Sequence, residues 1–435
     1  MAKKIKGAAS TRAKQTSSKA ASTGDPQFAQ PKLTPDPTQF RTQHDTKGDD
    51  AAYKTLDKEA STLKPLPFEP SRGGVEPILQ LADVLGSAGA ASVKAITQRQ
   101  QIVFHALGDT GNTRSVQPQN AVTDKLVTDF QEANPDEVPS FLFHLGDVVY
   151  SFGEAQYYYD QFYEPYRDYP RPIIAIAGNH DGMVAPGSAT PTLQAFLANF
   201  CALAPVHTAQ AGGLNRTAMI QPGVYYTFEA PFVRILALYS NRLEDPGVIS
   251  KQGATYPDLS NVQLDYLKAA LQRIHDEKFL GAVIIAVHHP PYTTGKHGGS
   301  PIMLQEIDAA CKSTGTWPHA VLSGHAHSYQ RYTRATGNME IPYIIAGNGG
   351  HGLTPLVRRG DPALRVPSPL ATSPGVTFEN YDDQDYGYLR VLVNAQQLRI
   401  EYHPASDGAA AKTPDDFVTV DLKTRKLVHF KAAAA

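Results

Sequence analysis

The 435-residue sequence is poor in cysteine and almost neutral in net charge, and both shortages exclude broad classes of protein. Cys201 and Cys311 are its only cysteines, so the chain carries neither a disulfide framework nor a thiolate metal site. With 40 Lys and Arg against 42 Asp and Glu, the net charge of -2 argues against a globally basic nucleic-acid-binding protein. The low thiol count is also compatible with a reducing compartment.

Long apolar runs are missing as well. No stretch reaches the roughly 18 consecutive apolar residues that a membrane span needs. Six lysines and arginines precede the first acidic residue, Asp25, and no hydrophobic run follows them. Such a start is no secretory signal peptide, and without an amphipathic period it favours a solvated tail over an organellar transit peptide. We therefore expect a cytoplasmic protein without a membrane span, with export by another route left open.

Aliphatic residues become frequent only after about residue 72, and this composition divides the chain in two. Residues 1–72 are rich in Pro, Gln, Thr, Lys and Asp, which predicts a disordered, basic and polar N-terminal segment. Because this segment also carries no motif, we expect it to be dispensable for catalysis. Residues 73–430 are predicted to form a single catalytic domain, since nothing marks a second one.

Within this domain, apolar segments alternate with segments of helical period. The predicted strands are residues 102–107, 141–145, 173–176, 233–238, 282–287 and 320–322. A helix is predicted at residues 122–133, and another after a capping box formed by Ser260 and Gln263. Residues 386–403 alternate as a hairpin. This alternation of strands and helices predicts an α/β fold in which helices cover sheets.

Five of the predicted strands run directly into short polar clusters. In chain order these clusters read ALGDTG, HLGDVVY, IAGNHDG, AVHHPPY and LSGHAHSYQR. In open α/β sheets, ligands bind beyond the carboxyl ends of the strands, so the side chains of all five clusters can converge on one point. Carboxylate oxygens and imidazole nitrogens suit iron, zinc or manganese. The pattern therefore predicts a metal centre.

The order of these clusters resembles that of the calcineurin-like metallophosphoesterases, over about residues 101–327. The resemblance implies a sandwich of two mixed β-sheets flanked by helices, with two metal ions. Most members of that superfamily carry Asp-x-His at the first motif, whereas in this chain the motif is Asp109-Thr110-Gly111. Tyr150, three residues after Asp147, lies where a replacement ligand would be needed. This pairing resembles the purple acid phosphatases, in which the tyrosine binds a ferric ion as phenolate.

The ligands follow from this resemblance. The first ion would be iron(III), held by Asp109, Asp147, Tyr150 and His327. The second ion, a divalent Fe, Zn or Mn, would be held by Asp147, Asn179, His288 and His325. A phenol with a reference pKa of about 10 stays protonated unless a strongly acidic metal binds it, so Tyr150 favours ferric iron over zinc or magnesium.

The same resemblance implies that phosphate monoesters are hydrolysed as in an acid phosphatase. A hydroxide on the metal ions would attack phosphorus, and a general acid would protonate the leaving group. His180 is the candidate acid, because it neighbours Asn179 and is absent from the ligand set, and Asp181 would orient it. His297 lies where the family places another histidine that contacts the substrate.

Several other residues near the motifs are given structural interpretations. His105 and His144 lie inside predicted strands, so we expect them to be hydrogen-bonded core residues. His288 is preferred to His289 as a ligand, because the family ligand lies two residues before the proline. His351 is assigned to a tight turn. The aromatic run at residues 157–170 is assigned to core packing.

Three functions stay open from the sequence. The first is a phosphomonoesterase of the purple acid phosphatase type, acting on a small-molecule phosphate ester. The second is a phosphodiesterase or nucleotide hydrolase at the same metal ions, because fold and metals do not determine the substrate. The third is a non-catalytic scaffold or a nucleic-acid-binding protein that uses the basic tail. The intact ligand set counts against this last function.

Overall fold

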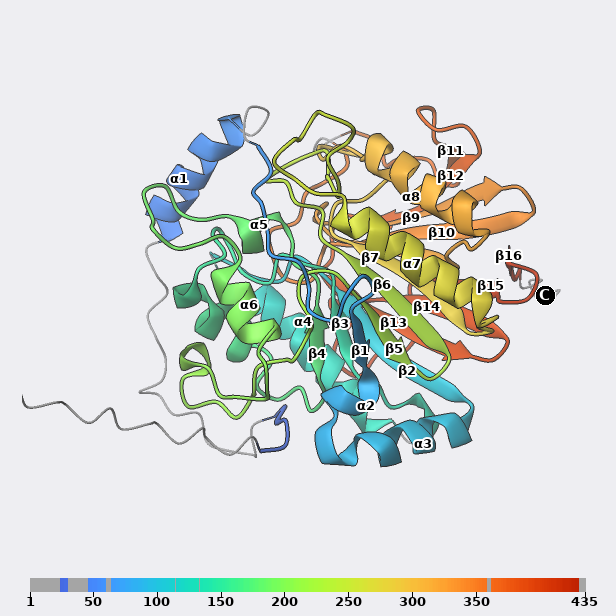
Figure 1. The fold of residues 1–435 in the computed structure, drawn as a ribbon, viewed down its shortest axis with the longest axis horizontal. Helices are drawn as coiled ribbons and strands as arrows, with labels where there is room; N and C mark the ends of the chain where they lie inside the picture. The colour runs from blue at the N-terminus through green and yellow to red at the C-terminus, as the bar shows by residue number, and fades with distance from the viewer. Residues whose placement is uncertain are drawn as a thin grey trace, which may run out of the picture.

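A computed structural model describes residues 24–29, 46–59, 64–113, 115–132, 134–357 and 361–429 of the protein. Two mixed β-sheets pack face to face, and helices flank them (Figure 1). This arrangement confirms the predicted fold. No helix within the described ranges is long and apolar enough to cross a membrane.

The seven-stranded sheet joins the first motif-bearing strands to the C-terminal part of the chain. Its order is β16-β15-β14-β13-β2-β3-β4, in which β2, β3 and β4 run parallel and the other neighbours pair antiparallel. The strands are β2 (Gln101–Leu107), β3 (Leu142–His144), β4 (Ile173–Ala175), β13 (Gly387–Asn394), β14 (Gln397–Pro404), β15 (Asp416–Asp421) and β16 (Lys426–Leu427). The predicted hairpin is confirmed as β13 and β14.

The nine-stranded sheet carries the later motifs. Its order is β1-β5-β6-β7-β8-β10-β9-β12-β11, and β6, β7, β8 and β10 run parallel. The strands are β1 (Ile78–Gln80), β5 (Tyr226–Ala230), β6 (Val233–Leu238), β7 (Ala282–Val287), β8 (Ala320–Ser323), β9 (Tyr329–Thr336), β10 (Met339–Ala346), β11 (Ser368–Pro369) and β12 (Val376–Asp382). Every residue of β7 is buried, as expected for a central parallel strand that is covered on both faces.

Aromatic side chains fill the space between the two sheets. The ring of Phe141 lies 4.6 Å from that of Phe104 and 4.9 Å from that of Phe228, which belongs to the opposite sheet. The Tyr226 hydroxyl donates a hydrogen bond to the backbone oxygen of Ala175 at 2.8 Å, from one sheet to the other. These contacts fix how the strand ends of the two sheets lie relative to each other.

Helices cover the outer faces. In Figure 1, α7 (Val262–Asp276) and α8 (Pro301–Thr314) lie over the nine-stranded sheet. The others are α2 (Leu81–Val84), α3 (Gly89–Arg99), α4 (Gln117–Thr128), α5 (Asn179–Gly182) and α6 (Gln194–Phe200). The predicted capping box before α7 is wrong. The Gln263 carboxamide instead bonds the backbone N and O of Tyr239, both at 2.8 Å, because β6 ends beside it.

The structure also differs from the sequence prediction in the N-terminal segment. Residues Thr46–Glu59 form a helix, α1, although the segment was expected to lack structure. Ala52, Tyr53 and Leu56 lie on one side of α1 and pack against the core, which is enough to dock a short helix. The remaining parts of residues 1–72 that can be described are 24–29 and 64–72, so the expectation for residues 1–23, 30–45 and 60–63 lies outside the described structure.

Candidate metal centre and active site

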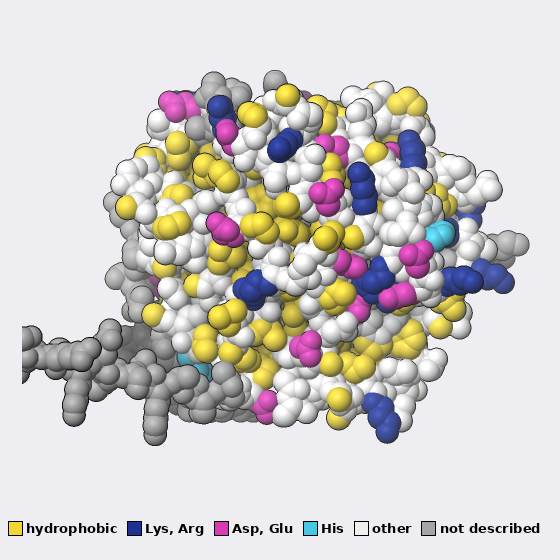
Figure 2. Space-filling model, viewed as in Figure 1, with side chains coloured by type: hydrophobic (Ala, Val, Ile, Leu, Met, Phe, Trp, Pro, Cys, Tyr) yellow, Lys and Arg dark blue, Asp and Glu magenta, His cyan; other side chains and the backbone are white. Residues whose placement is uncertain are grey.

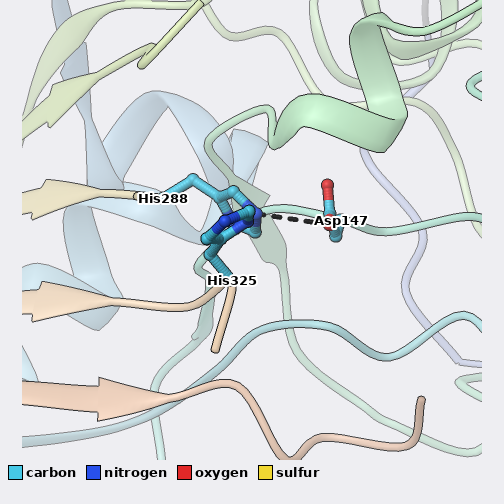
Figure 3. Close-up of side chains that lie close together, drawn as sticks. All are labelled: Asp147, His288 and His325. Atoms are coloured by element: carbon cyan, nitrogen blue, oxygen red, sulfur yellow. Dashed lines mark ion pairs between the residues drawn. The ribbon is translucent and has the colours of Figure 1, made fainter. Parts of the chain in front are cut away.

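The seven predicted metal ligands come from loops that leave the carboxyl ends of five strands. β2, β3 and β4 belong to the seven-stranded sheet, whereas β7 and β8 belong to the nine-stranded sheet. The site therefore lies where the strand ends of the two sheets meet. Figure 3 shows His288 and His325 close together with Asp147 facing them.

One set of ligands, which we call the Tyr150 group, consists of Asp109, Asp147, Tyr150 and His327. The Tyr150 hydroxyl lies 2.9 Å from Asp109 Oδ1 and 2.9 Å from Asp147 Oδ2. The Nε2 atom of His327 lies 3.4 Å from the same hydroxyl and 3.5 Å from Asp109 Oδ1. These four side chains therefore lie close together, as the ligands of one ion must.

The other set, which we call the Asn179 group, consists of Asp147, Asn179, His288 and His325. His288 Nε2 lies 3.2 Å from Asp147 Oδ2 and 3.1 Å from Asn179 Oδ1. His325 Nδ1 lies 3.1 Å from the same amide oxygen. Asp147 belongs to both groups, which places its carboxylate between them.

The backbone at three of these ligands is left-handed. The φ angles are 57° at Asp109, 54° at Asp147 and 69° at His325, and such angles in non-glycine residues cluster at functional sites. The Asp147 carboxylate also packs closely against the backbone of Gly178, since a Cβ at that position would lie 2.1 Å from Asp147 Oδ1. Backbone amides then hold the carboxylates in place. Asp109 Oδ2 accepts from His325 N at 2.8 Å, and Asp147 Oδ1 accepts from His180 N at 2.9 Å.

The Tyr150 group is rich in buried oxygen atoms. The Tyr150 hydroxyl has one proton, yet it lies at hydrogen-bonding distance from two carboxylates. Burial, followed by the charges of Asp109 and Asp147, raises the pKa of Tyr150 well above its ordinary value. Burial likewise raises the pKa of Asp109. Because buried negative charge is costly unless it is paired, this donor set fits bound metal cations.

The imidazoles of the centre are held in a fixed orientation by backbone carbonyls. His288 Nδ1 faces the oxygen of Leu145 at 2.7 Å, and His327 Nδ1 faces the oxygen of Gly352 at 2.9 Å. Such outer contacts leave Nε2 for a metal ion. Burial by itself would lower the pKa of His288, but the carboxylates of Asp147 and Asp109 outweigh it and raise the pKa to about 10. Metal binding would therefore release a proton from His288.

His325 has a further partner that the sequence analysis missed. Its Nε2 lies 3.0 Å from Asp245 Oδ1. A neutral imidazole carries one proton, so an N–H donated to Asp245 leaves the lone pair of Nδ1 directed at the Asn179 group. Asp245 follows Glu244 in a polar loop after β6. The rule that polar clusters follow strand ends, applied to predicted strand 233–238, is the signal that could have found it.

Position 111 has no room for the histidine of most family members. A Cβ on Gly111 would lie 2.3 Å from Gln161 Oε1 and 2.8 Å from Val149 Cα. The Gln161 carboxamide in turn bonds the backbone N and O of Tyr150 at 2.7 and 2.6 Å. His351, which the sequence assigns to a turn, also stacks on the Tyr150 ring with the centroids 3.7 Å apart. Tyr150 is therefore held rigidly in the place where a ligand is needed.

His180 lies beside the metal ligands, between two tyrosines. Its ring centroid is 4.2 Å from that of Tyr150 and 4.7 Å from that of Tyr53. His180 Nδ1 faces the backbone oxygen of Ser151 at 2.7 Å. The Asp181 carboxylate instead accepts from the backbone N of Gly178 at 2.8 Å and from that of Val148. The Ser151 carbonyl, and not Asp181 as predicted, therefore orients the imidazole.

A cavity of about 540 Å³ opens beside the centre. Tyr150, His180 and His327 line it from the side of the centre. His297 also lines it, with Nδ1 3.8 Å from Asp245 Oδ2, so this predicted site residue reaches the same space. The other residues on its wall include Tyr53, Lys54, Asp57, Glu244 and Lys296.

The residues given structural interpretations have structural partners. His105 Nε2 lies 3.0 Å from Asp129 Oδ2, in the core. His144 Nε2 lies 2.9 Å from Thr110 Oγ1. His289 Nδ1 lies 2.8 Å from Ser240 Oγ, and its ring packs against that of His325 with the centroids 4.1 Å apart. The tyrosines of the run at residues 157–170 are buried.

Comparisons with known proteins agree with this geometry. The model of the family described as calcineurin-like phosphoesterase matches residues 102–329, a range that contains all seven ligands. No curated protein sequence matches the chain. A solved structure of purple acid phosphatase PPD1 from yellow lupin (Lupinus luteus) seeds is similar, with 14% identity and a TM-score of 0.50.

The lupin similarity covers 77% of this chain but 57% of that protein, so less than two thirds of its length is matched. A second similar structure is GAP50, the anchor in the inner membrane complex of Plasmodium, with 14% identity and a TM-score of 0.48. It covers 72% of this chain and 88% of that one. At such identities, the lupin similarity shows a shared fold alone.

Proposed function

The chain belongs to the calcineurin-like phosphoesterase family, and we propose that it hydrolyses phosphate monoesters in the manner of a purple acid phosphatase. Family and fold support the coarser statement, a metal-dependent phosphoesterase with two metal ions. The finer proposal rests on one observation. The buried hydroxyl of Tyr150 lies between the carboxylates of Asp109 and Asp147, a set of oxygen ligands that suits a bound cation.

We further propose iron(III) in the Tyr150 group and a divalent ion, Fe, Zn or Mn, in the Asn179 group. Two bound ions would supply Lewis acidity, which lowers the pKa of a water and offsets charge on the phosphoryl group. A phenolate ligand requires a strongly acidic metal, because the buried hydroxyl of Tyr150 otherwise keeps its proton. The tight packing at Gly111 supports the same assignment, since it leaves Tyr150 as the ligand at that place.

The protein side chains would handle the leaving group. When the bond between phosphorus and the ester oxygen breaks, the departing alkoxide needs a proton, and His180 is placed to donate it. With Nδ1 held by the Ser151 carbonyl, the Nε2 atom is the one left to transfer that proton. Lys54 and Lys296 line the cavity and bring positive charge toward a phosphate dianion, and His297 lines the same cavity.

The other functions that the sequence leaves open receive less support. A nucleic-acid-binding surface is expected to be basic, whereas basic and acidic side chains are interspersed on the face in Figure 2. A scaffold has no use for a buried centre rich in acceptors, which costs free energy to keep. A phosphodiesterase would use the same centre, so only the substrate separates it from our proposal.

Turnover of an aryl phosphate monoester tests the proposal directly. The purified, metal-loaded protein should hydrolyse it, and His327→Ala should reduce the rate to background, because the Tyr150 group loses a ligand. His207→Ala is the matched control, since this histidine is exposed and should leave the rate unchanged. Full turnover in His327→Ala would remove the assignment. Faster hydrolysis of a diester than of a monoester would establish the phosphodiesterase instead.

A further inference from the structure

One wall of the cavity beside the metal centre comes from outside the range that matches the family. Helix α1 precedes that range and contributes Tyr53, Lys54 and Asp57 to the lining. Figure 1 shows α1, in blue, near α5, the short helix that carries His180. A segment that the sequence analysis set aside is therefore part of the space in which a substrate would bind.

Specific contacts hold α1 in this place. The Tyr157 hydroxyl donates a hydrogen bond to the Asp49 carboxylate, and the Tyr53 hydroxyl donates one to the Glu244 carboxylate. Asp49, Tyr53 and Leu56 follow the i, i+4, i+7 spacing, so one face of the helix makes all these contacts. Glu244 adjoins Asp245, the partner of His325, and α1 is thereby linked to the loop that supports a predicted ligand.

The ring of Tyr53 covers the residue that would handle the leaving group. It lies 4.7 Å from the His180 ring at an interplanar angle of 44°, on the cavity side of that imidazole. A leaving group that takes a proton from His180 must come within hydrogen-bonding reach of it. A leaving group bound at His180 therefore lies beside the Tyr53 ring.

We propose that Tyr53 is a specificity-determining residue, which closes the cavity over His180 and selects compact, polar leaving groups. The charges around it agree with this, because Lys54, Lys296, Asp57 and Glu244 all line the same cavity. Two charges of each sign suit a leaving group with several hydroxyl groups better than a large apolar one. This inference rests on the proposed phosphoesterase function.

Two alkyl phosphates of different size test it, since both need a proton on the leaving oxygen. The measured quantity is kcat/KM for 2-phenylethyl phosphate divided by kcat/KM for glycerol phosphate. Tyr53→Ala should raise this ratio by about tenfold, because the ring no longer limits the bulky group. Tyr53→Phe should keep the ratio within about twofold of wild type. Lys58→Ala, on an exposed position of α1, is the control and should change nothing.

A ratio that stays at the wild-type value in Tyr53→Ala, with metal content and Tm preserved, overturns the proposal. If that variant fails to fold, Tyr53→Trp takes its place. Its larger ring should lower the ratio, and an unchanged ratio again contradicts the proposal. Removal of residues 1–63 should act like Tyr53→Ala, with turnover of glycerol phosphate kept and selectivity lost.

A binding measurement separates this inference from the proposed activity. Trypsin should cut the full-length, metal-loaded protein at the exposed Lys54, and 2,3-dihydroxypropylphosphonate, a compact polar probe, should slow that cut. The bulkier 2-phenylethylphosphonate should slow the cut only in Tyr53→Ala, where the ring no longer excludes it. A wild-type protein that is protected but hydrolyses no ester would refute the proposed function and keep the wall. Equal cleavage with and without either phosphonate would refute the claim that α1 lines the cavity in which a substrate binds.

Discussion

Two clusters of this protein are built around buried aspartates together with histidine and tyrosine, one in the core and one at the strand ends. The core cluster consists of Asp129, His105, Tyr388 and Lys412. Asp129 Oδ2 lies 3.0 Å from His105 Nε2 and 2.8 Å from the Tyr388 hydroxyl, and Lys412 bonds Oδ1. The metal centre uses the same kinds of side chain around Asp109, Asp147 and Tyr150.

The clusters differ in the balance of donors and acceptors. In the core cluster one carboxylate receives three donors, and Lys412 supplies the opposite charge. Burial would raise the pKa of Asp129, but its contacts with His105, Lys412 and Tyr388 outweigh burial and lower it. In the metal centre one tyrosine proton lies between two carboxylates. Balance of this kind, more than residue type, separates a structural cluster from a site that binds cations.

The strongest test of this comparison replaces one aspartate in each cluster by asparagine. Asp147→Asn should reduce hydrolysis of an aryl phosphate to background and lower the content of both metals, because Asp147 belongs to both ligand groups. Asp129→Asn should keep metal content and kcat, yet lower the free energy of unfolding by about 1.5–3 kcal/mol, as expected for hydrogen bonds to a charged group. Equal loss of metal in the two variants would erase the distinction that we draw.

The histidines offer the next largest effect. His180→Ala should lower kcat for an alkyl phosphate by about 10²–10⁴-fold, with metal content near wild type, because the leaving group loses its proton donor. An activated aryl phosphate, whose leaving group needs no proton, should lose little. His105→Ala, in the core cluster, should lower Tm and keep kcat. Equal losses of rate on both substrates would show that His180 stabilises charge, and a metal-depleted His180→Ala would make it a ligand.

The tyrosines give a smaller change in rate but a sharper signature. A phenolate of Tyr150 on ferric iron should produce a visible absorption band, and Tyr150→Phe should remove this band and weaken iron binding by at least about tenfold. Tyr388→Phe should leave the band intact, since its hydroxyl donates to Asp129, which belongs to neither ligand group. Iron content must be measured with each spectrum. A fully iron-loaded, oxidised sample without a band rules out the phenolate.

The smallest expected effect is the dependence of stability on pH. The folded pKa of Asp129 lies below its unfolded value of about 3.9, so its contribution is complete above about pH 4 and is lost as pH falls further. The difference in unfolding free energy between wild type and Asp129→Asn should therefore be full at pH 7 and shrink toward pH 2. Urea unfolding at several pH values measures it. A difference that does not change with pH would mean that the charge of Asp129 is not what stabilises the core.

Much of the fold and of the centre could be predicted from short stretches of sequence. Strands 233–238 and 282–287 have the bounds that the sequence predicts, because a buried parallel strand is a continuous apolar run. The structure brings the seven predicted ligands together, and it adds Asp245, which was not predicted, beside His325. Each predicted ligand follows a predicted strand within a few residues, and parallel strands end at one edge of a sheet. Each of these patterns, an apolar strand and the polar cluster after it, spans only about ten residues and can therefore be recognised locally.

What the tertiary structure alone decided are the contacts between segments far apart in sequence. Ala52, Tyr53 and Leu56 form the apolar side of helix α1, and so few apolar residues give the segment the composition of a disordered one. The helix is stabilised by hydrogen bonds of Asp49 and Tyr53 to residues far away in the sequence. Gln263 bonds the backbone of Tyr239 instead of capping its own helix. The carbonyl of Ser151 orients His180, a role that the sequence analysis assigned to Asp181. The local pattern of this sequence determined where strands end and which ligands follow them, because strand and turn depend on neighbouring residues. The wall of the cavity and the outer hydrogen bonds depend on free energy gained only when distant surfaces meet, and no short stretch of sequence records that.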